Sequence, residues 1–438
     1  MVSHPDLTWH DQQRLGQIFL SLLAFAGCAV GWQTPRVRWS PVWLIAGAAT
    51  IILGVLSSCF SILPVWALVE VALLICSIGI GAFVYSLAKL DAARADLILG
   101  GFIRILLGGV VLQFFVSYFS ALMHAELYFI PWALLSGFSN VRHEGQFLSI
   151  ALPLLGAELL APEGGLRRYP RWLDFGLMIA LACMVAVAGT RGTIAAWLLV
   201  SACFIPFGGR ARQLAKRVSA AMAAGFALAW CMLKFATWVT NQEAMFRFSD
   251  KSALGLSARE IIWQDAFTKI LENPWLGIGP MHFASLKSPI AAHPHQALLQ
   301  IASEWGLPAL CIVIFAVCVW MLRAFRFAIA NDGKKETEIA WCILFSVSAA
   351  IIQSQVDGVL VMPYPQVWLA IVVGWGSAKF IDSRIGRSVL LPYWIPMVLF
   401  FIAVALLLAI GFHDYPALVG APEFCPLGPR FWCHGLIE

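Results

Sequence analysis

Long blocks of apolar residues alternate along the chain with short polar connections. Twelve blocks come close to the roughly 20 helical residues that match the hydrocarbon core of a bilayer, and the shorter ones predict tilted or broken helices. The blocks lie near residues 15–32, 41–63, 65–88, 98–122, 145–161, 172–189, 193–208, 218–238, 303–322, 340–358, 367–380 and 393–412. The pattern predicts an all-α, polytopic membrane protein of about 12 transmembrane helices.

The composition excludes an ordinary soluble protein. Of 438 residues, 61% are hydrophobic and only 12% are charged, against about 25% charged residues in a typical soluble domain. A soluble domain of this length could not cover that much apolar surface. Residues 1–14 are polar and contain no basic run before a short apolar core, so we expect the first apolar block to be a retained helix and not a cleaved signal peptide.

The Lys and Arg residues predict the orientation in the membrane, because cytoplasmic loops are enriched in both. Six short connections hold 18 of the 29, and they alternate with poorly charged connections, which we expect to be extracytoplasmic. The same count places both termini outside, and one missed or spurious helix near the N-terminus would reverse that end. The expected segments are helices 1–8 in 1–238, a long extracytoplasmic loop in 239–302, helices 9–12 in 303–412 and a tail in 413–438.

Cysteine usage gives no sign of a metal centre. Nine of the eleven cysteines fall within apolar blocks, where a cysteine behaves as a small buried hydrophobe. The chain has no CxxC pair and no His/Cys cluster at zinc-finger spacing. Cys425 and Cys433 lie in the tail, where they either form a disulfide in an oxidising compartment or remain free.

The long loop contains a predicted amphipathic helix. In residues 259–271 the apolar side chains recur at helical spacing, opposite Glu260, Asp265 and Lys269, which favours a helix lying on the membrane surface. A following Asn-Pro should end this helix. The next turn, Gly-Ile-Gly-Pro, follows no strand and lacks the third glycine of a dinucleotide-binding motif. The alternative interpretation of the loop is a structural cap over the helices, and the two are compatible.

Three arginines fall on the extracytoplasmic side, where the positive-inside bias should deplete them. Arg142 comes just before the fifth block, Arg191 lies in the short turn after the sixth, and Arg259 lies in the long loop. An isolated arginine there would be interpreted as a side chain that snorkels to lipid headgroups. Three together favour an anionic ligand such as a lipid-linked diphosphate, because arginine binds phosphate in bidentate fashion and stays charged.

The sequence His293-Pro294-His295-Gln296 leads into the ninth block. Proline restricts the residue before it to extended geometry, so we expect His293 to precede the helix and His295 to lie in its first turn. The positive end of the helix dipole would then favour a neutral imidazole, the form that accepts a proton as a general base. The alternative is a histidine that caps the helix or forms a hydrogen bond at the membrane interface.

These motifs resemble the O-antigen ligase-like superfamily of bacterial membrane glycosyltransferases, which includes O-antigen ligases, O-antigen polymerases and protein O-oligosaccharyltransferases. The family's loop signature is a histidine, then Asn, Ser or Gln, then nine residues and Gly-x-x-Gly. Here it reads His295-Gln296, nine residues and Gly306-Leu307-Pro308-Ala309, with Ala309 in place of the usual last residue. Further resemblances, within a likeness that covers most of residues 140–310, lie at Arg259, Trp263, 273–279, Phe283, 189–192 and 146–155.

The resemblance implies a GT-C-like fold and an enzyme that passes a glycan from undecaprenyl diphosphate to an acceptor hydroxyl on the periplasmic side of the inner membrane. It implies no cofactor, no metal and no nucleic-acid partner. His295 would be the catalytic base, and the three extracytoplasmic arginines would bind the diphosphate, whose negative charge grows in the transition state. Secondary roles are expected for His293, Gln296, Glu304 and Asp357.

Within the superfamily, an O-antigen ligase with a lipid A-core acceptor fits best. A protein oligosaccharyltransferase usually carries more chain after the histidine loop, and a polymerase often has two arginine-rich extracytoplasmic loops. A transporter of lipid-linked sugars would also place arginines near a diphosphate, but it should show inverted repeats, broken helices and charges near the midplane. A purely structural membrane subunit would leave Arg191 and His295 replaceable.

Overall fold

The structure is a computed structural model, and it describes residues 6–31, 41–124, 134–157, 170–244, 257–286, 288, 290–332, 336–380, 394–420 and 430–433. Every regular element in these residues is helical. Seven helices are long and apolar enough to cross a bilayer, namely α2 (Pro41–Cys59), α3 (Pro64–Leu90), α4 (Ala92–Met123), α7 (Arg171–Ala188), α9 (Gly209–Thr240), α12 (Leu307–Ala330) and α15 (Trp394–Leu418). The predicted polytopic, all-helical membrane protein is therefore confirmed.

The other elements are shorter or more polar. They are α1 (Trp9–Gly31), α5 (Val141–Ala151), α8 (Arg191–Phe204), α10 (Ser257–Glu272), α11 (Ala297–Trp305), α13 (Glu336–Gln353) and α14 (Pro363–Phe380), with the 3-10 helices η2 (Leu152–Leu155), η3 (Ile205–Phe207) and η6 (His282–Leu286). Each of the twelve apolar blocks overlaps a helix. Apolar runs become helices because a helix satisfies its backbone hydrogen bonds internally, where lipid offers no partners.

The described chain divides into two compact units. The first comprises Met1–Ala93, Leu256–Ala324 and Ser354–Glu438, and α1, α2, α14 and α15 pack around α3 within it. Helices α3 and α14 cross with their backbones nearly in contact, since a Cβ added at Gly374 would lie 2.2 Å from the carbonyl oxygen of Gly81. Paired small residues allow such close crossings in membrane helices. The unit is thereby a tight bundle whose centre is α3.

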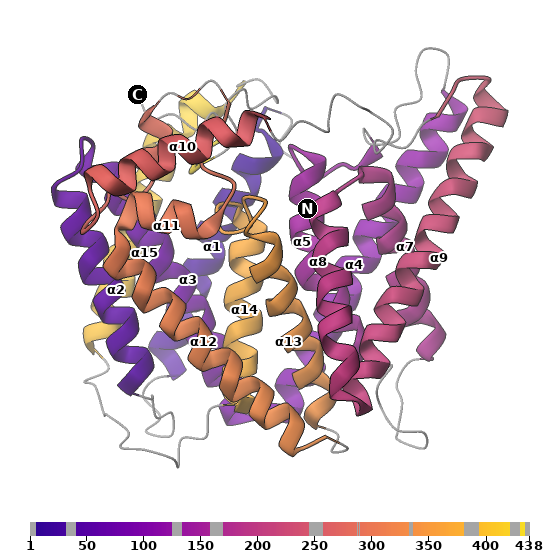
Figure 1. The fold of residues 1–438 in the computed structure, drawn as a ribbon, viewed down its shortest axis with the longest axis horizontal. Helices are drawn as coiled ribbons and strands as arrows, with labels where there is room; N and C mark the ends of the chain where they lie inside the picture. Colours follow the sequence, from indigo (N-terminus) through magenta and orange to yellow (C-terminus); the bar gives the residue numbers. More distant parts are fainter. Residues whose placement is uncertain are drawn as a thin grey trace. The chain divides into compact units, whose positions relative to one another are not determined.

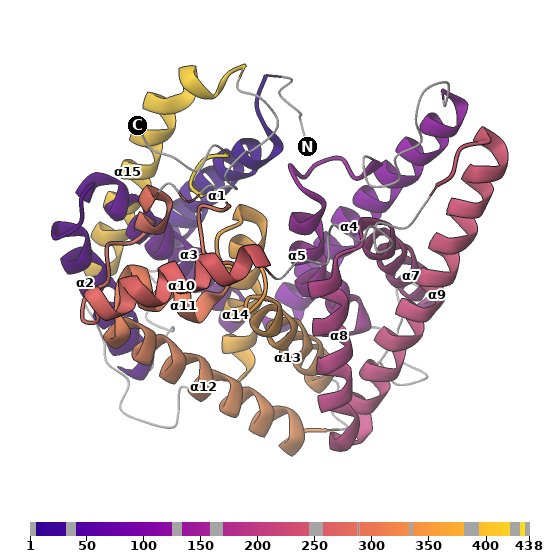
Figure 2. The same cartoon turned by 45° about the horizontal axis from the view of Figure 1, so that its top comes forward.

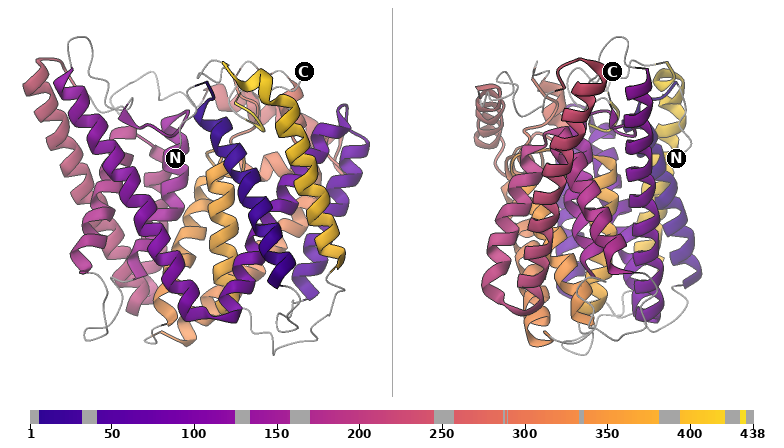
Figure 3. Two further views of the ribbon diagram at one scale, coloured as in Figure 1. Left: turned by 180° about the vertical axis from the view of Figure 1, so that it is seen from behind. Right: turned by 90° about the vertical axis from the view of Figure 1, so that its right-hand side faces the viewer.

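Helix α10 lies across one end of this first unit. Its axis runs roughly perpendicular to the long helices of the unit (Figures 1 and 3), and with that end turned forward it is seen above α11 (Figure 2). Ile262 and Ala266 of α10 are buried against Phe283 and Ala291. Ile261 and Phe267, on the other side of the helix, are more than half exposed. The predicted helix therefore forms, and its apolar residues are divided between a packed face and an open one.

The second unit comprises Arg94–Gly255 and Phe325–Gln353. Helices α7 and α9 lie side by side along much of their length (Figure 1), and Gly225 of α9 allows α9 to approach the backbone of Cys183 in α7. Helix α13 packs against α5 and α8. Phe204 and Trp341 form an edge-to-face ring contact, with centroids 5.6 Å apart, where α8 meets α13. Phe204 is the last residue of α8, so this contact fixes the end of α8, while its start is held by Gln353 of α13, whose Nε2 donates to Oγ1 of Thr193 at 2.9 Å.

Candidate functional site

The backbone of His295 adopts a left-handed conformation, with φ of 54°. This conformation is uncommon for a residue other than glycine and is typical of constrained sites. The backbone N–H of His295 donates to Nδ1 of His293 at 3.2 Å, and the two imidazole rings lie 4.0 Å apart. Neutral His293 therefore carries its proton on Nε2. The two histidines form one compact turn.

The expectation that His295 lies in the first turn of a helix is wrong. Helix α11 begins at Ala297, and Gln296 is its N-cap, with the Gln296 side chain accepting the N–H of Leu299. The helix then ends at Gly306, whose φ of 84° separates it from α12. The predicted ninth block is thus two helices, and His295 sits one residue before the N-cap of the first. Its imidazole is not part of that helix.

Asp357 lies beside His295. Its Oδ1 is 4.0 Å from Nδ1 of His295 and also accepts the N–H of Gly358 at 2.9 Å. The chain that follows α13 runs along the histidine turn, because Gln296 Nε2 donates to Gln355 Oε1 at 3.2 Å. The structure therefore places His293, His295, Gln296 and Asp357 together, as a site containing all four would require. A carboxylate beside a histidine can orient the ring and stabilise its protonated form.

Helix α10 is tied to the same turn. The indole N–H of Trp263 donates to the carbonyl oxygen of Pro294 at 3.1 Å. Arg259 lies four residues before Trp263, so the two side chains share one face of α10. Arg259 is half-buried. The arginine of the loop is thereby carried on the helix face that contacts the histidine turn.

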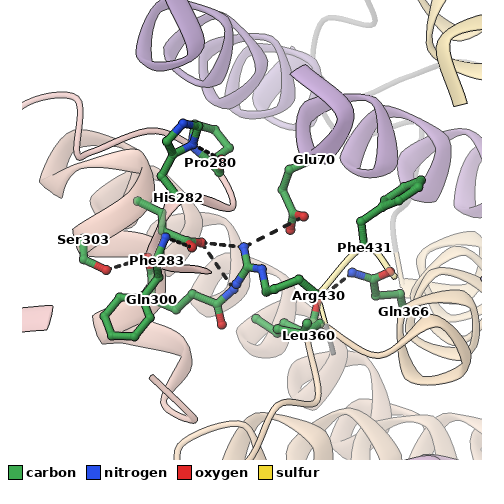
Figure 4. Close-up of polar contacts among 12 residues, drawn as sticks. Glu70, Pro280, His282, Phe283, Gln300, Ser303, Leu360, Gln366, Arg430 and Phe431 are labelled. Carbon is green, nitrogen blue, oxygen red and sulfur yellow. Dashed lines mark hydrogen bonds and ion pairs between the residues drawn. The ribbon is translucent and has the colours of Figure 1, made fainter. Parts of the chain in front are cut away.

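Glu304 makes buried polar contacts, and its secondary role at the site stays a prediction. It lies in the last turn of α11 and is fully buried. Its Oε1 accepts the N–H of Phe283 at 3.0 Å, and its Oε2 accepts from Nη2 of Arg430 at 2.9 Å (Figure 4). Burial raises the pKa of the Glu304 carboxyl, and the Arg430 guanidinium opposes that shift. Glu304 and Arg430 therefore form a buried ion pair.

Sequence reasoning missed Arg430 and His282. Arg430 belongs to the tail, where hydropathy registers only a charged residue in a polar segment. His282 accepts the N–H of Leu63 on Nε2, and Nδ1 lies 2.9 Å from the carbonyl oxygen of Pro280, to which it donates in the matching tautomer. Both ring nitrogens of His282 therefore form hydrogen bonds. In the sequence, the nearby proline that follows the Gly-Ile-Gly turn is the local feature that could have drawn attention to this histidine.

Arg142 and Arg191 lie in the second unit, each at the start of a helix. Arg142 is the second residue of α5, and its N–H donates to the Asn140 side chain at 3.0 Å. Arg191 is the first residue of α8, after the left-handed Gly189 that ends α7. The two helix starts touch, since a Cβ at Gly145 would lie 2.7 Å from Oγ1 of Thr190. The structure therefore brings these two exposed arginines onto adjacent helix N-termini.

Helix N-termini favour anions, because their N–H groups and dipoles point toward the ligand. Two adjacent N-termini that each carry an arginine suit a phosphate group for both reasons. Arg259 and the histidine turn belong to the other unit. That all of them surround one donor site stays a prediction.

Glu144 is a further residue that sequence reasoning missed. It is fully buried in α5, and neither carboxylate oxygen has a hydrogen-bond partner among the described residues. An isolated buried carboxylate is costly to charge, so we expect this group to be neutral. In the sequence, Glu144 directly follows Arg142 and His143. Hydropathy treats these three residues as one polar connection and does not single out Glu144.

The segment that contains most of these residues matches a known family. A family model described as O-antigen ligase aligns with residues 176–314. Residues 176–314 are therefore similar to the O-antigen ligase family. An O-antigen ligase from Pseudomonas aeruginosa is 28% identical over 151 residues, which are 32% of this chain and 35% of that protein. The alignment therefore spans about a third of the length of this relative.

The matched segment includes Arg191, Arg259, His295 and Glu304. It runs from α7 into the first part of α12, and the predicted family resemblance is confirmed over this segment. Arg142, Asp357 and the tail lie outside it. Cys433 of the tail is disulfide-bonded, and Cys425, the partner that the sequence suggests, lies outside the described residues.

Proposed function

We propose that this protein is an O-antigen ligase, a multi-pass glycosyltransferase of the bacterial inner membrane whose active site faces the periplasm. About twelve helices would cross the bilayer in a GT-C-like arrangement. The enzyme would transfer a glycan from undecaprenyl diphosphate to the lipid A-core oligosaccharide. The observation that carries the proposal is the position of His295 beside Asp357. His295 itself lies in the segment whose sequence matches the ligase family.

His295 is the proposed general base. As the acceptor oxygen bonds to the anomeric carbon of the glycan, its proton passes to the neutral imidazole. The bond between the anomeric carbon and the phosphate oxygen breaks, and undecaprenyl diphosphate leaves with the electron pair. Asp357 would orient the ring and stabilise the imidazolium that forms. Their 4.0 Å separation is longer than a hydrogen bond, and such contacts often shorten when substrate binds.

Arg142, Arg191 and Arg259 are the proposed cations of the donor site. The leaving diphosphate gains negative charge, and preorganised positive groups stabilise that charge more in the transition state than in the bound donor. The two adjacent helix starts in the second unit support this role for Arg142 and Arg191. Because arginines supply the positive charge, the proposed reaction needs no divalent metal.

Transfer by the purified full-length protein tests this proposal. The donor is undecaprenyl-diphosphate glycan, the acceptor is a core lipid, and the buffer contains EDTA. Wild-type protein should form the glycosylated core lipid, while His295→Ala and His295→Asn should form at least about 10²-fold less. Asn adopts the left-handed conformation more readily than Ala, so it keeps the backbone of the turn. Strict dependence on added metal, or normal transfer by His295→Asn, would overturn the mechanism.

Deletion strains separate the ligase from other activities. Loss of the ligase should leave lipid-linked glycan of normal length distribution in the membrane. Loss of long chains, with single units still attached to the core, would identify a polymerase. Loss of a glycosylated protein would identify an oligosaccharyltransferase. If membranes of the deletion strain still transfer glycan in vitro as wild-type membranes do, while the donor accumulates on the cytoplasmic face, the protein is a transporter.

A further inference from the structure

The last described residues of the chain, Arg430–Cys433, form a clip that is held by the first helix. Arg14 of α1 donates from Nε to the carbonyl oxygen of Phe431 at 3.0 Å and from Nη2 to that of Arg430 at 2.9 Å. The N–H of Cys433 donates to Oδ1 of Asp11 at 2.8 Å. These contacts are buried. They fix the clip along its whole length.

The side chain of Arg430 extends from the clip into the interior of the first unit (Figure 4). It is 1% exposed, and its Nη2 lies 2.9 Å from Oε2 of Glu304 and 4.0 Å from Oε2 of Glu70. Its Nε and Nη1 have no hydrogen-bond partner in the described chain. The hydrogen bond to Glu304 is therefore the closest compensation of the Arg430 charge, and Glu70 contributes from a longer distance. Removing one partner of such a buried pair leaves the other charge uncompensated, which is far more damaging than removing both.

Glu304 joins two parts of the loop that carries the histidines to each other and to α2. Its side chain accepts the N–H of Phe283 in η6 at 3.0 Å. Its carbonyl oxygen accepts the N–H of Gly279 at 3.1 Å and the Ser57 hydroxyl at 3.2 Å. Glu304 itself lies in α11, which starts two residues after His295. The position of Glu304 thus sets how the 279–286 segment packs against the helix that follows the histidine turn.

We propose that Arg430 is a positioning residue: the C-terminal clip inserts it against Glu304 and so fixes the loop that presents His295. Arg430 touches no reacting group and acts only through Glu304. This inference rests on the proposed ligase function for its kinetic consequence, and on the hydrogen bonds of Glu304 for its structural one. Without Arg430, the buried carboxylate must take up a proton or draw the 279–286 segment toward water.

The test compares four full-length variants in detergent. Arg430→Met removes the charge and keeps most of the side-chain length, and the double variant Arg430→Met/Glu304→Gln removes both charges. The matched control is the other buried pair, Arg210 and Glu338, whose Nη2 and Oε1 lie 3.1 Å apart in the second unit. It supplies Arg210→Met and Arg210→Met/Glu338→Gln. Each variant is measured for glycan transfer and for amide hydrogen exchange without substrate.

Arg430→Met should lower kcat by about tenfold or more while the donor KM changes less than about threefold, since small displacements of a catalytic group have effects of this size. Exchange at the Gly279 and Phe283 amides should rise at least about tenfold. The double variant should recover most of the lost kcat. Both Arg210 variants should leave these amides and kcat unchanged, whatever they do to thermal stability.

Wild-type kcat and wild-type exchange in Arg430→Met would overturn the inference. So would an equal loss of kcat in Arg210→Met, because that would reflect general destabilisation. If the wild-type protein transfers no glycan, the proposed function fails, and exchange at Gly279 and Phe283 still decides whether Arg430 holds the loop.

Discussion

Substituting Gly358 by alanine should disturb the site without removing any chemical group. Gly358 follows Asp357, and an added Cβ would lie 2.5 Å from Cε1 and 2.9 Å from Nε2 of His293. Gly358 has no positive φ, so alanine is allowed by the backbone and only the contact with the ring is at issue. His293 is 1% exposed and therefore has little room to yield. The added methyl group should displace its imidazole.

The size of the effect follows from these distances. A carbon–carbon contact needs about 3.5 Å, so the ring must move by roughly 1 Å. Overpacking of this kind costs about 1–3 kcal/mol of stability. Nδ1 of His293 accepts the backbone N–H of His295, so the turn that carries the proposed base moves as well. A displacement of about 1 Å can lower a catalytic rate by about 10²-fold.

Thermal unfolding and glycan transfer are measured together for Gly358→Ala and for a control, Gly47→Ala. Gly47 lies in α2 of the same unit, and an added Cβ there meets nothing within 4 Å. Alanine in a helix is favoured over glycine by up to about 1 kcal/mol, so the control should keep wild-type transfer and lose no stability. Gly358→Ala should lose at least about tenfold in kcat. Wild-type kcat in Gly358→Ala would refute the argument that the position of His293 matters.

Three further predictions concern neighbouring groups. Asp357→Asn should lower kcat by about 10²-fold at an unchanged donor KM, because the imidazolium of His295 loses its carboxylate; an unchanged kcat in transfer assays would contradict this role. Trp263→Phe should cost about 1 kcal/mol in denaturant unfolding, since the bond to Pro294 is lost, and equal midpoints would show that the bond contributes nothing. Burial, with Arg430 nearby, lowers the pKa of His282. The contribution of neutral His282 to the free energy of unfolding should therefore be fully present above about pH 6.5 and should decline as the pH falls below that value. The slope should flatten in His282→Gln when melting is followed from pH 7.5 to 5, and an identical slope would exclude this histidine as its source.

The positions of the helices could be predicted from the sequence because hydropathy is a local property. Each apolar block overlaps a helix, and the loop helix was visible in the spacing of its apolar residues. The break at Gly306 could not be predicted, because its left-handed backbone interrupts an otherwise apolar run from α11 into α12. The left-handed turn at His295 is equally invisible in hydropathy, and the expectation of a helical His295 failed for this reason.

The proximity of Asp357 to His295 depends on contacts between residues 62 positions apart along the chain, which a single sequence does not reveal. The sequence marked both as polar residues in unusual places. It could not show that Asp357 faces the histidine and that Glu304 faces a tail arginine instead. Arg430 itself carries no local signal, because its function depends on an acidic partner buried in a distant helix.

The pairing of Arg430 with Glu304 also sets an order of assembly. Ribosomes make the chain from its N-terminus, so Glu304 has already been synthesised while its partner, 126 residues later, has not. Until the clip docks against α1, the loop carries a buried carboxylate without its cation. The histidine turn should therefore reach its final form only after synthesis ends, and a fusion that prevents the clip from docking should yield a protein that is inserted and helical but inactive.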